Sequence, residues 1–332
     1  MKRLLVVIVV AGALWSGYWV VAMRGAMAGF EAWFAARRAE GWQADYAALT
    51  VRGYPNRIDT TFDRPALADP ETGLAWEAPF FQIFALSYKP NHIIAVWPDI
   101  QRFSTPRAKY MISSADMRAS LVMAPDPTLA LQRSNLVAGA IAIEGPDGTT
   151  TLEGLQAAVG LSDGAVQDYR IAINSDGFAP PAPTGLTLRT GGRLPHRFDA
   201  LRADLSVAFD KPWDLTALEE RRPQPRTIRL KLAEAKWGEL ELALAGQLAV
   251  DAAGRPNGRL TVKARNWRDI IALARAGRWL PASWLDPIEE ALTLTAQLSG
   301  NSQTLDLPLD FKNGTMSLGP FPLGAAPVLQ IR

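Results

Sequence analysis

The chain has 332 residues, of which 48% are hydrophobic and 20% charged, which is the composition of a folded protein rather than a disordered one. Its 26 glycines and 24 prolines interrupt too many segments for an all-helical bundle. The 35 basic and 33 acidic residues leave a net charge of +2, and there is no cysteine. We therefore expect no nucleic-acid partner, no disulfide and no thiolate metal site.

An uncharged apolar run at the N-terminus, residues 4–23, is the strongest signal in the sequence. At about 1.5 Å per residue it spans about 30 Å, the thickness of the hydrocarbon core of a bilayer. Lys2 and Arg3 precede it, and because positive charge is kept on the cytoplasmic side, the rest of the chain is predicted to lie on the other side. Trp15, Tyr18 and Trp19 lie toward the far end, as is typical of a membrane–water interface.

A cleaved signal peptide is the alternative, because Ala26-Met27-Ala28 fits a small-x-small cleavage site. However, the apolar run exceeds the usual apolar region of a signal peptide, about 7–15 residues. A helical pattern also continues past the site, with Phe30 and Phe34 on one face, until Gly41 ends it. We therefore predict an uncleaved transmembrane signal-anchor over residues 1–23 and a juxtamembrane amphipathic helix over residues 24–45.

Beyond residue 45 apolar and polar residues alternate, a period that indicates strands with one buried and one solvated face. The clearest runs are residues 228–232, 240–250, 260–262, 292–298 and 305–311, with weaker ones at 117–123, 169–173 and 201–209. The fold class predicted is mainly β: an N-terminal transmembrane helix followed by antiparallel, one-sided sheets (a curved sheet, a sandwich or an open barrel) with a few short helices. The polar rows expected to face solvent are Arg229, Lys231, Glu241, Thr261, Lys263, Thr293 and Asp306.

Three short helices are predicted within the β-rich part, at residues 213–222, 267–276 and 286–291. The second begins after Asn266, a favourable N-cap, and ends at Gly277, while Pro287 suits the first position of the third. The proline-rich residues 179–183 are the best candidate boundary between an N-terminal β-rich half, 46–180, and a C-terminal β-rich half, 181–332. A rigid loop inside one continuous sheet explains the same prolines equally well.

Residues with catalytic chemistry are few. The two histidines, His92 and His196, are isolated and are interpreted as structural or exposed, and no hydrolase, phosphate-binding or dinucleotide motif is present. The carboxylate pairs Glu219-Glu220 and Glu289-Glu290 suit exposed helix faces. Asp63, Asp69, Glu71 and Glu77 could bind Ca²⁺, but their spacing matches no EF-hand, so solvated turns are favoured. We predict no catalytic, cofactor-binding or metal residue, no cofactor, and that the protein is not an enzyme.

The chain contains 11 tryptophans, whose positions bear on both core packing and contact with lipid. Packing in cores and at sheet edges is the favoured role for each of them, because an indole buries a large apolar area. Contact with lipid is the alternative, since an indole combines an apolar body with a polar tip. The positions in the body of the chain are Trp76, Trp97, Trp213, Trp237, Trp267, Trp279 and Trp284.

Three segments carry a family resemblance when taken in order with the N-terminal anchor. They are residues 52–59 (RGYPNRID), residues 76–98 (WEAPFFQIFALSYKPNHIIAVWP) and residues 313–324 (NGTMSLGPFPLG). Together they resemble domain of unknown function 2125, an uncharacterised family of Gram-negative, mainly alphaproteobacterial proteins. The resemblance implies a protein anchored in the inner membrane by a single pass, with the bulk of the chain in the periplasm, and it implies no functional residues. The last segment is also similar, at the level of fold alone, to AsmA-like envelope proteins, which handle lipid along curved sheets.

Two functions follow from these expectations. The first is a module that contacts or transfers phospholipid, because one-sided strands with few helices leave an apolar face that acyl chains could cover. Coverage by a second sheet is the simpler alternative for that face. The second function is a structural or adaptor protein of the cell envelope that binds other proteins, and a hydrolase with an unrecognised site ranks third. The partners expected are therefore the inner membrane, through the N-terminal helix, and either phospholipid or envelope proteins.

Overall fold

A computed structural model of the protein describes residues 1–162, 164–181, 197–277 and 303–331, together with 285–286, 289–290, 292–293 and 296. Over this part of the chain the protein is mainly β, with strands joined in antiparallel ladders, as predicted. Its contacts divide it into two compact units: residues 1–125 with 136–146, and residues 126–135 with 147–331. The boundary expected near residue 180 adjoins residues 182–196, which lie outside the described residues, and it stays a prediction.

Unit 1 begins with one long helix, α1 (Lys2–Ala39), which includes both the apolar run and the expected juxtamembrane segment. It is the one helix of the described chain that is long and apolar enough to cross a membrane. Gly41, at a φ of +90°, turns the chain after the helix, so residues 43–45 already form a strand rather than continuing the helix. Phe30 and Phe34 pack on a core that contains Phe62 and Phe81, as their helical spacing predicts.

The strands of unit 1 form two antiparallel series, β2–β3–β6–β7–β10 and β1–β4–β5–β8–β9–β11. Their bounds are β1 (Gln43–Asp45), β2 (Ala48–Arg52), β3 (Arg57–Asp63), β4 (Ala66–Asp69), β5 (Leu74–Glu77), β6 (Phe80–Leu86), β7 (Lys89–Val96), β8 (Ile100–Ser104), β9 (Lys109–Ser114), β10 (Arg118–Met123) and β11 (Leu131–Gly145). The side chains of Phe62, Phe81 and Ile83 face α1, and the alternate residues of these strands face away from it.

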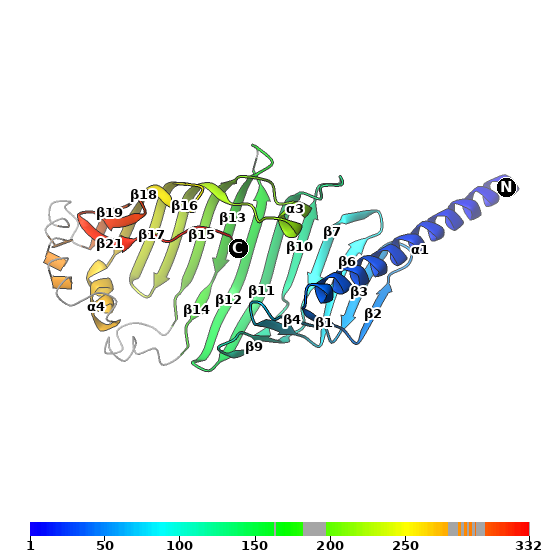
Figure 1. Ribbon diagram of the computed structural model, residues 1–332, viewed down its shortest axis with the longest axis horizontal. Coiled ribbons are helices and arrows are strands. Elements are labelled where there is room, and N and C mark those ends of the chain that lie inside the picture. Colours follow the sequence, from blue (N-terminus) through cyan, green and yellow to red (C-terminus); the bar gives the residue numbers. More distant parts are fainter. Residues whose placement is uncertain are drawn as a thin grey trace. The chain divides into compact units, whose positions relative to one another are not determined.

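Unit 2 is an antiparallel meander in which strands follow one another along the chain in the order β12–β13–β15–β16–β17–β18–β19–β20–β21 (Figure 1). Its strands are β12 (Gly148–Leu161), β13 (Asp168–Ser175), β14 (Gly177–Ala179), β15 (Ala200–Phe209), β16 (Pro225–Trp237), β17 (Leu240–Val250), β18 (Pro256–Arg265), β19 (Thr304–Lys312), β20 (Thr315–Leu318) and β21 (Phe321–Ala325). The short β14 pairs with the start of β12. Among the described residues the ladder does not close on itself.

Two of the three predicted short helices have well-defined bounds. Helix α3 (Leu215–Glu219) begins at Asp214, whose side chain accepts a hydrogen bond from the Ala217 amide, and α4 (Trp267–Gly277) follows β18 directly.

The strand predicted at residues 292–298 is wrong where the structure describes it, because residues 292, 293 and 296 are helical. Leu292 and Ala296, one helical turn apart, pack together with Trp267 and Leu305, and the Thr293 hydroxyl donates to the Glu289 carbonyl four residues earlier. Leu294 and Leu298 lie outside the described residues.

Candidate functional site

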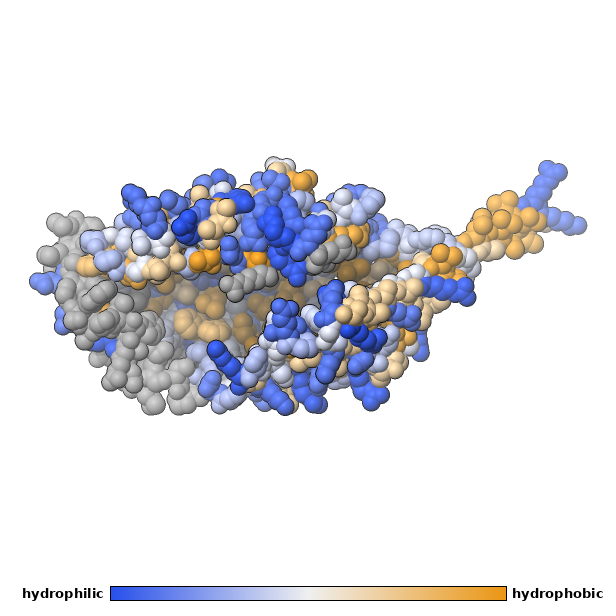
Figure 2. Space-filling model, in the orientation of Figure 1, coloured by the Kyte–Doolittle hydropathy of each residue, from blue (hydrophilic) through white to orange (hydrophobic). Residues whose placement is uncertain are grey.

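One face of the unit 2 sheet is apolar across seven strands, from β12 to β19, and we call it the apolar face. Residues that pair directly across neighbouring strands on this face are mostly apolar, so apolar side chains form rows across the sheet. One row is Val159, Ile171, Leu205, Leu230, Gly246, Leu260 and Leu309, and the next is Ala157, Ile173, Ala203, Ala233, Leu244, Val262 and Leu307. Figure 2 shows apolar side chains in a hollow below a hydrophilic upper edge over these strands.

A shift in register on β16 sets which residues reach this face. The pairs with β17 pass from Leu230–Gly246 to Ala233–Leu244, so Lys231 and Leu232 form a bulge. After the bulge, Ala233 and Ala235 continue the apolar face, and Leu232 pairs with Asp204 on the opposite side. Simple alternation from Leu230 to Leu232 is therefore broken, and Ala233 stands on the apolar face where Leu232 was expected.

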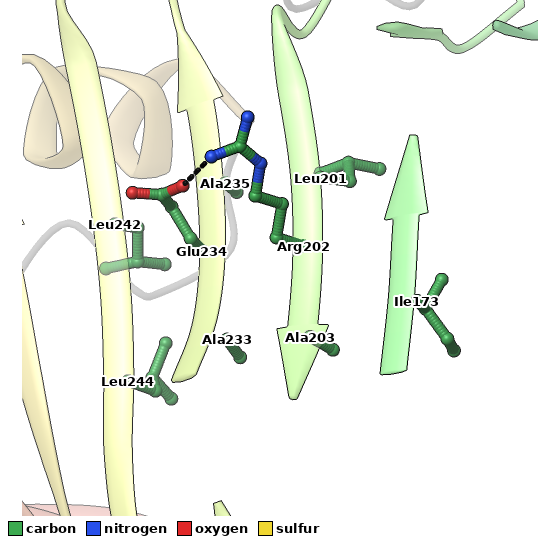
Figure 3. Close-up of a pocket in the computed structure, with 9 residues that line it drawn as sticks. All are labelled: Ile173, Leu201, Arg202, Ala203, Ala233, Glu234, Ala235, Leu242 and Leu244. Carbon is green, nitrogen blue, oxygen red and sulfur yellow. Dashed lines mark ion pairs between the residues drawn. The ribbon is translucent and has the colours of Figure 1, made fainter. Parts of the chain in front are cut away.

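An open hollow lies on the apolar face over β13, β15, β16 and β17, where alanines of β15 and β16 stand between larger residues of β13 and β17. Its volume is about 220 Å³, and its walls are Ile173 on β13, Leu242 and Leu244 on β17, and Leu201 and the alanines between them; the Arg202–Glu234 ion pair, at 3.7 Å, also lines it (Figure 3). Ile173 keeps 44% of its surface exposed, and the leucines of the walls are only half-buried. Small side chains on β15 and β16 between large ones on β13 and β17 thus leave an open apolar depression.

The opposite face of the sheet is polar and carries ion pairs. Arg170 makes a bidentate contact with Asp204, at 2.9 and 2.7 Å, and Arg259 pairs with Asp310 at 2.6 Å. The hydrogen bond from Arg170 holds the pKa of the Asp204 carboxyl below its ordinary value. Of the residues predicted to face solvent, Arg229, Lys231, Thr261, Lys263 and Asp306 are exposed, whereas Glu241 and Thr293 are half-buried. Such exposed pairs add little stability, so this face is adapted to water rather than to packing.

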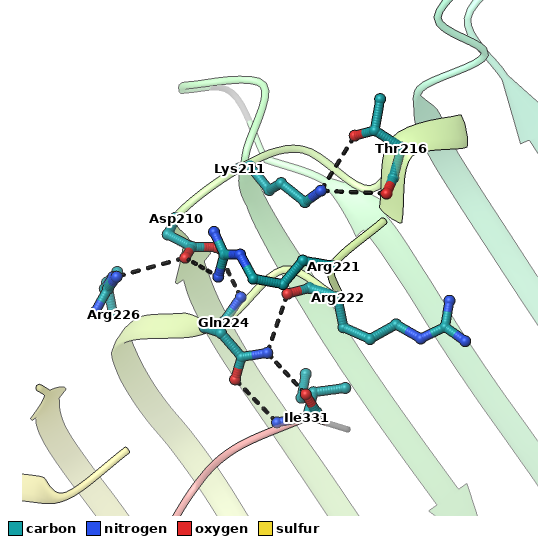
Figure 4. A network of polar contacts seen from close by, with 8 residues as sticks. All are labelled: Asp210, Lys211, Thr216, Arg221, Arg222, Gln224, Arg226 and Ile331. Atoms are coloured by element: carbon teal, nitrogen blue, oxygen red, sulfur yellow. Dashed lines mark hydrogen bonds and ion pairs between the residues drawn. The ribbon is translucent and has the colours of Figure 1, made fainter. Parts of the chain in front are cut away.

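A polar network lies at the opposite end of β15 and β16 from the hollow, where Asp210 follows β15 and Gln224 precedes β16 (Figure 4). The Asp210 carboxylate is only 10% exposed. It accepts hydrogen bonds from Arg221 at 2.8 Å, from Arg226 at 3.4 Å and from the backbone N–H of Gln224 at 2.8 Å. Desolvation raises the pKa of Asp210, but the Gln224 amide and the two guanidinium groups outweigh it and hold that pKa below its ordinary value. The side-chain amide of Gln224 also donates to the Ile331 carbonyl at 2.7 Å and accepts from the Ile331 backbone N–H at 3.0 Å, and so fixes the C-terminal segment at this end of the strands.

Unit 1 has a second hollow, on the side of β3, β6 and β7 that faces away from the α1 core. Its volume is about 340 Å³, and it is lined by Arg57, Phe84, Ala85, Leu86, His92 and Ile94. The Arg57 guanidinium lies 5.2 Å from the centre of the Phe84 ring and 3.0 Å from an Asp59 carboxylate oxygen. The site therefore combines an apolar floor with one cation and one histidine at its wall.

The structure does not bring the candidate catalytic and metal residues together. His92 lines the second hollow beside Arg57, and His196 lies outside the described residues. Asp69 accepts hydrogen bonds from the Glu71 amide and the Thr72 hydroxyl in the β4–β5 turn, and these bonds, that from Thr72 first, lower its pKa. Asp63 pairs with Arg64, and Glu77 with Arg102. In the described part of the chain, no three His, Asp or Glu residues lie close enough to hold a metal ion.

The remaining acidic pairs and the tryptophans have structural surroundings where they are described. Glu289 pairs with Arg275 at 2.9 Å, and Glu220 is exposed. Trp267 is buried in a core cluster, Trp213 packs against Phe209, and Trp76 donates to Gln101 at 2.9 Å. Trp279 and Trp284 lie outside the described residues. Burial in cores therefore accounts for the body tryptophans named here.

A family model described as an uncharacterized protein conserved in bacteria (DUF2125) matches residues 19–327. The chain belongs to this DUF2125 family. No curated protein and no solved structure matches the chain, so the likeness to AsmA-like proteins stays an expectation. Membership of the DUF2125 family assigns neither an activity nor a site, and the two hollows therefore carry the functional argument.

Sequence reasoning found the one-sided strands but missed both hollows. The signal that could have indicated the first is the pair of small residues Ala233 and Ala235 opposite Leu244 and Leu242, but the register that aligns them depends on a bulge. The second hollow joins His92 to Arg57 across three strands, and only the pairing of β3 with β6 and of β6 with β7 brings them together.

Proposed function

We propose that this DUF2125 protein is a non-enzymatic, single-pass inner-membrane protein with its body in the periplasm, and that the apolar face of unit 2 binds the acyl chains of phospholipid. The observation that carries the proposal is the open hollow beside the part of the apolar face on which Trp267, Leu292 and Ala296 pack, since apolar surface is unfavourable in water unless something covers it. The described residues that line it leave 44% of the Ile173 surface exposed.

Membrane attachment supports acyl chains as the occupant. Helix α1 carries a long apolar run with basic residues before it, and it continues without interruption through Ala26-Met27-Ala28, the site at which a signal peptide would be cut. An uncleaved helix of this kind keeps the body of the protein close to a lipid surface. Acyl chains are then the most concentrated apolar molecules available to the hollow.

A photo-crosslinking experiment tests the proposal. The full chain is reconstituted in vesicles of phosphatidylethanolamine and phosphatidylglycerol that contain a phospholipid with a photoreactive group on its acyl chain. We expect crosslinked peptides from β13, β16 and β17 that contain Ile173, Ala233 or Leu244, in addition to those from α1. Crosslinks confined to α1 would contradict lipid binding by unit 2. Stoichiometric recovery of a bound envelope protein on this face would favour the adaptor function instead.

A further inference from the structure

Two turns of unit 1 are hydrogen-bonded to the part of α1 that the sequence predicts to lie within a bilayer. They are the β2–β3 turn, residues 53–56, and the β6–β7 turn, residues 87–88. The Trp15 indole donates to the Pro55 carbonyl at 3.0 Å, and the Trp19 indole donates to the Arg57 carbonyl at 2.7 Å. The Tyr18 hydroxyl donates to the Ser87 carbonyl at 2.5 Å. Three aromatic donors of one helical segment thus bind three backbone carbonyls at one end of the sheet.

Packing reinforces these hydrogen bonds. Trp19 is 8% exposed, and its ring meets the Tyr54 ring edge-on at 5.4 Å, while the Tyr54 hydroxyl lies 2.8 Å from the Ser16 hydroxyl. Gly53, at a φ of +105°, allows the turn to close, since a Cβ there would lie 2.7 Å from the Arg57 Cβ. The turns therefore have a fixed position along the helix axis.

That position lies within the apolar run rather than beyond it. Trp15 and Trp19 follow Leu4 by 11 and 15 residues, which corresponds to about 17 and 22 Å along a helix. The hydrocarbon core that the run matches is about 30 Å thick. If Leu4 lies at the inner edge of that core, both turns lie short of its outer edge.

The chemistry of the turns is compatible with this depth. A backbone carbonyl or an indole N–H that is unpaired in lipid is costly, and these groups pair with each other. Tyr54 and Tyr88 are 58% and 56% exposed, and tyrosine favours the membrane–water interface. Arg52 and Lys89 are exposed beside the turns, where their long side chains can reach headgroup phosphates.

We propose that the β2–β3 and β6–β7 turns of unit 1 are embedded in the membrane, in the leaflet distal to the N-terminus, with Tyr54 and Tyr88 as interfacial anchors. The proposal rests on the membrane crossing by α1 that is part of the proposed function. Unit 1 then contacts the membrane through its own turns as well as through the crossing by α1. It also places the second hollow, whose wall includes Arg57, next to lipid.

The absence of cysteine allows single-site labelling of the full chain. An environment-sensitive fluorophore is attached to Tyr88→Cys or to Asn56→Cys, both exposed turn positions, and the protein is reconstituted in vesicles of phosphatidylethanolamine and phosphatidylglycerol. Asp63→Cys is the matched control, because it is exposed at the opposite end of β3, about 20 Å from Arg57. Val10→Cys, in the middle of the apolar run, reports whether α1 crosses the membrane.

We expect the labels at 56 and 88 to show blue-shifted emission and quenching by lipids that carry a nitroxide on the acyl chain, and the label at 63 to show neither. The label at 10 should be quenched by nitroxides placed deep in the bilayer. Quenching at 10 with labels at 56 and 88 that behave like the label at 63 would overturn this inference and leave the anchor intact. No quenching at 10 would overturn both the anchor and the embedded turns.

Discussion

The Ile173→Asp substitution tests whether the hollow of unit 2 is open to lipid or filled by protein. Ile173 lies on the wall of the hollow with 44% of its surface exposed, so a carboxylate at this position can reach solvent when lipid leaves. Burying an isoleucine completely contributes about 1.5–3 kcal/mol to the free energy of unfolding. Because Ile173 is only about half-buried, the substitution removes roughly half of that contribution. The lower strand propensity of aspartate adds up to about 1 kcal/mol. We therefore expect a loss of about 1–2.5 kcal/mol in the free energy of unfolding, with the fold retained.

The assay combines stability and lipid contact on the full chain in lipid nanodiscs. Urea unfolding followed by circular dichroism gives the stability, and photo-crosslinking to an acyl-chain probe gives the contact, which should be lost in unit 2. Ser206→Asp is the matched control, since Ser206 lies on the polar face directly opposite Arg170 and Arg229 and its carboxylate would meet two cations. It should keep both the stability and the crosslink.

Two results would refute the reasoning. A loss above about 4 kcal/mol, or failure to fold, would mean that the carboxylate is buried without a partner and that protein covers the hollow. A variant that folds and keeps its crosslinks to β13 and β17 would mean that lipid does not occupy the hollow.

Three further outcomes are expected. Leu242→Ala should lower the free energy of unfolding by about 1–2 kcal/mol in urea titration, because Leu242 is half-buried, and a loss of about 5 kcal/mol would indicate a closed core. Val10→Arg should reduce membrane insertion by about 2.5–3.5 kcal/mol in a glycosylation-based insertion assay, whereas unchanged insertion would contradict the anchor. The pKa of Asp210 is lower in the folded protein, so its stabilising contribution is complete above about pH 4 and is lost as the pH falls through the folded-state value. Asp210→Asn should therefore show a weaker loss of stability on acidification than the unchanged protein, as measured by thermal unfolding at several pH values.

The sequence by itself determined the elements whose signals are local. An uncharged run of apolar residues is a helix in any environment that lacks water, and Gly41 ends it because glycine readily adopts a positive φ. Alternation over residues 240–250 and 305–311 predicted strands correctly, since a period of two places every second side chain on the same face. The family was also recognisable from the sequence, and its model matches residues 19–327.

Only the tertiary structure decided the features that depend on residues far apart in the chain. The spacing of Leu292 and Ala296 fits both a strand and a helix period, and the two residues are helical where they pack against Trp267. The bulge at Lys231 interrupts the pairing of β16 with both β15 and β17, and it places Ala233 rather than Leu232 on the apolar face. The hollow exists because that register sets small residues beside large ones across neighbouring strands. The register of long-range strand pairing cannot be predicted from a local pattern, because the same alternation is compatible with several registers and only the partner strands select one.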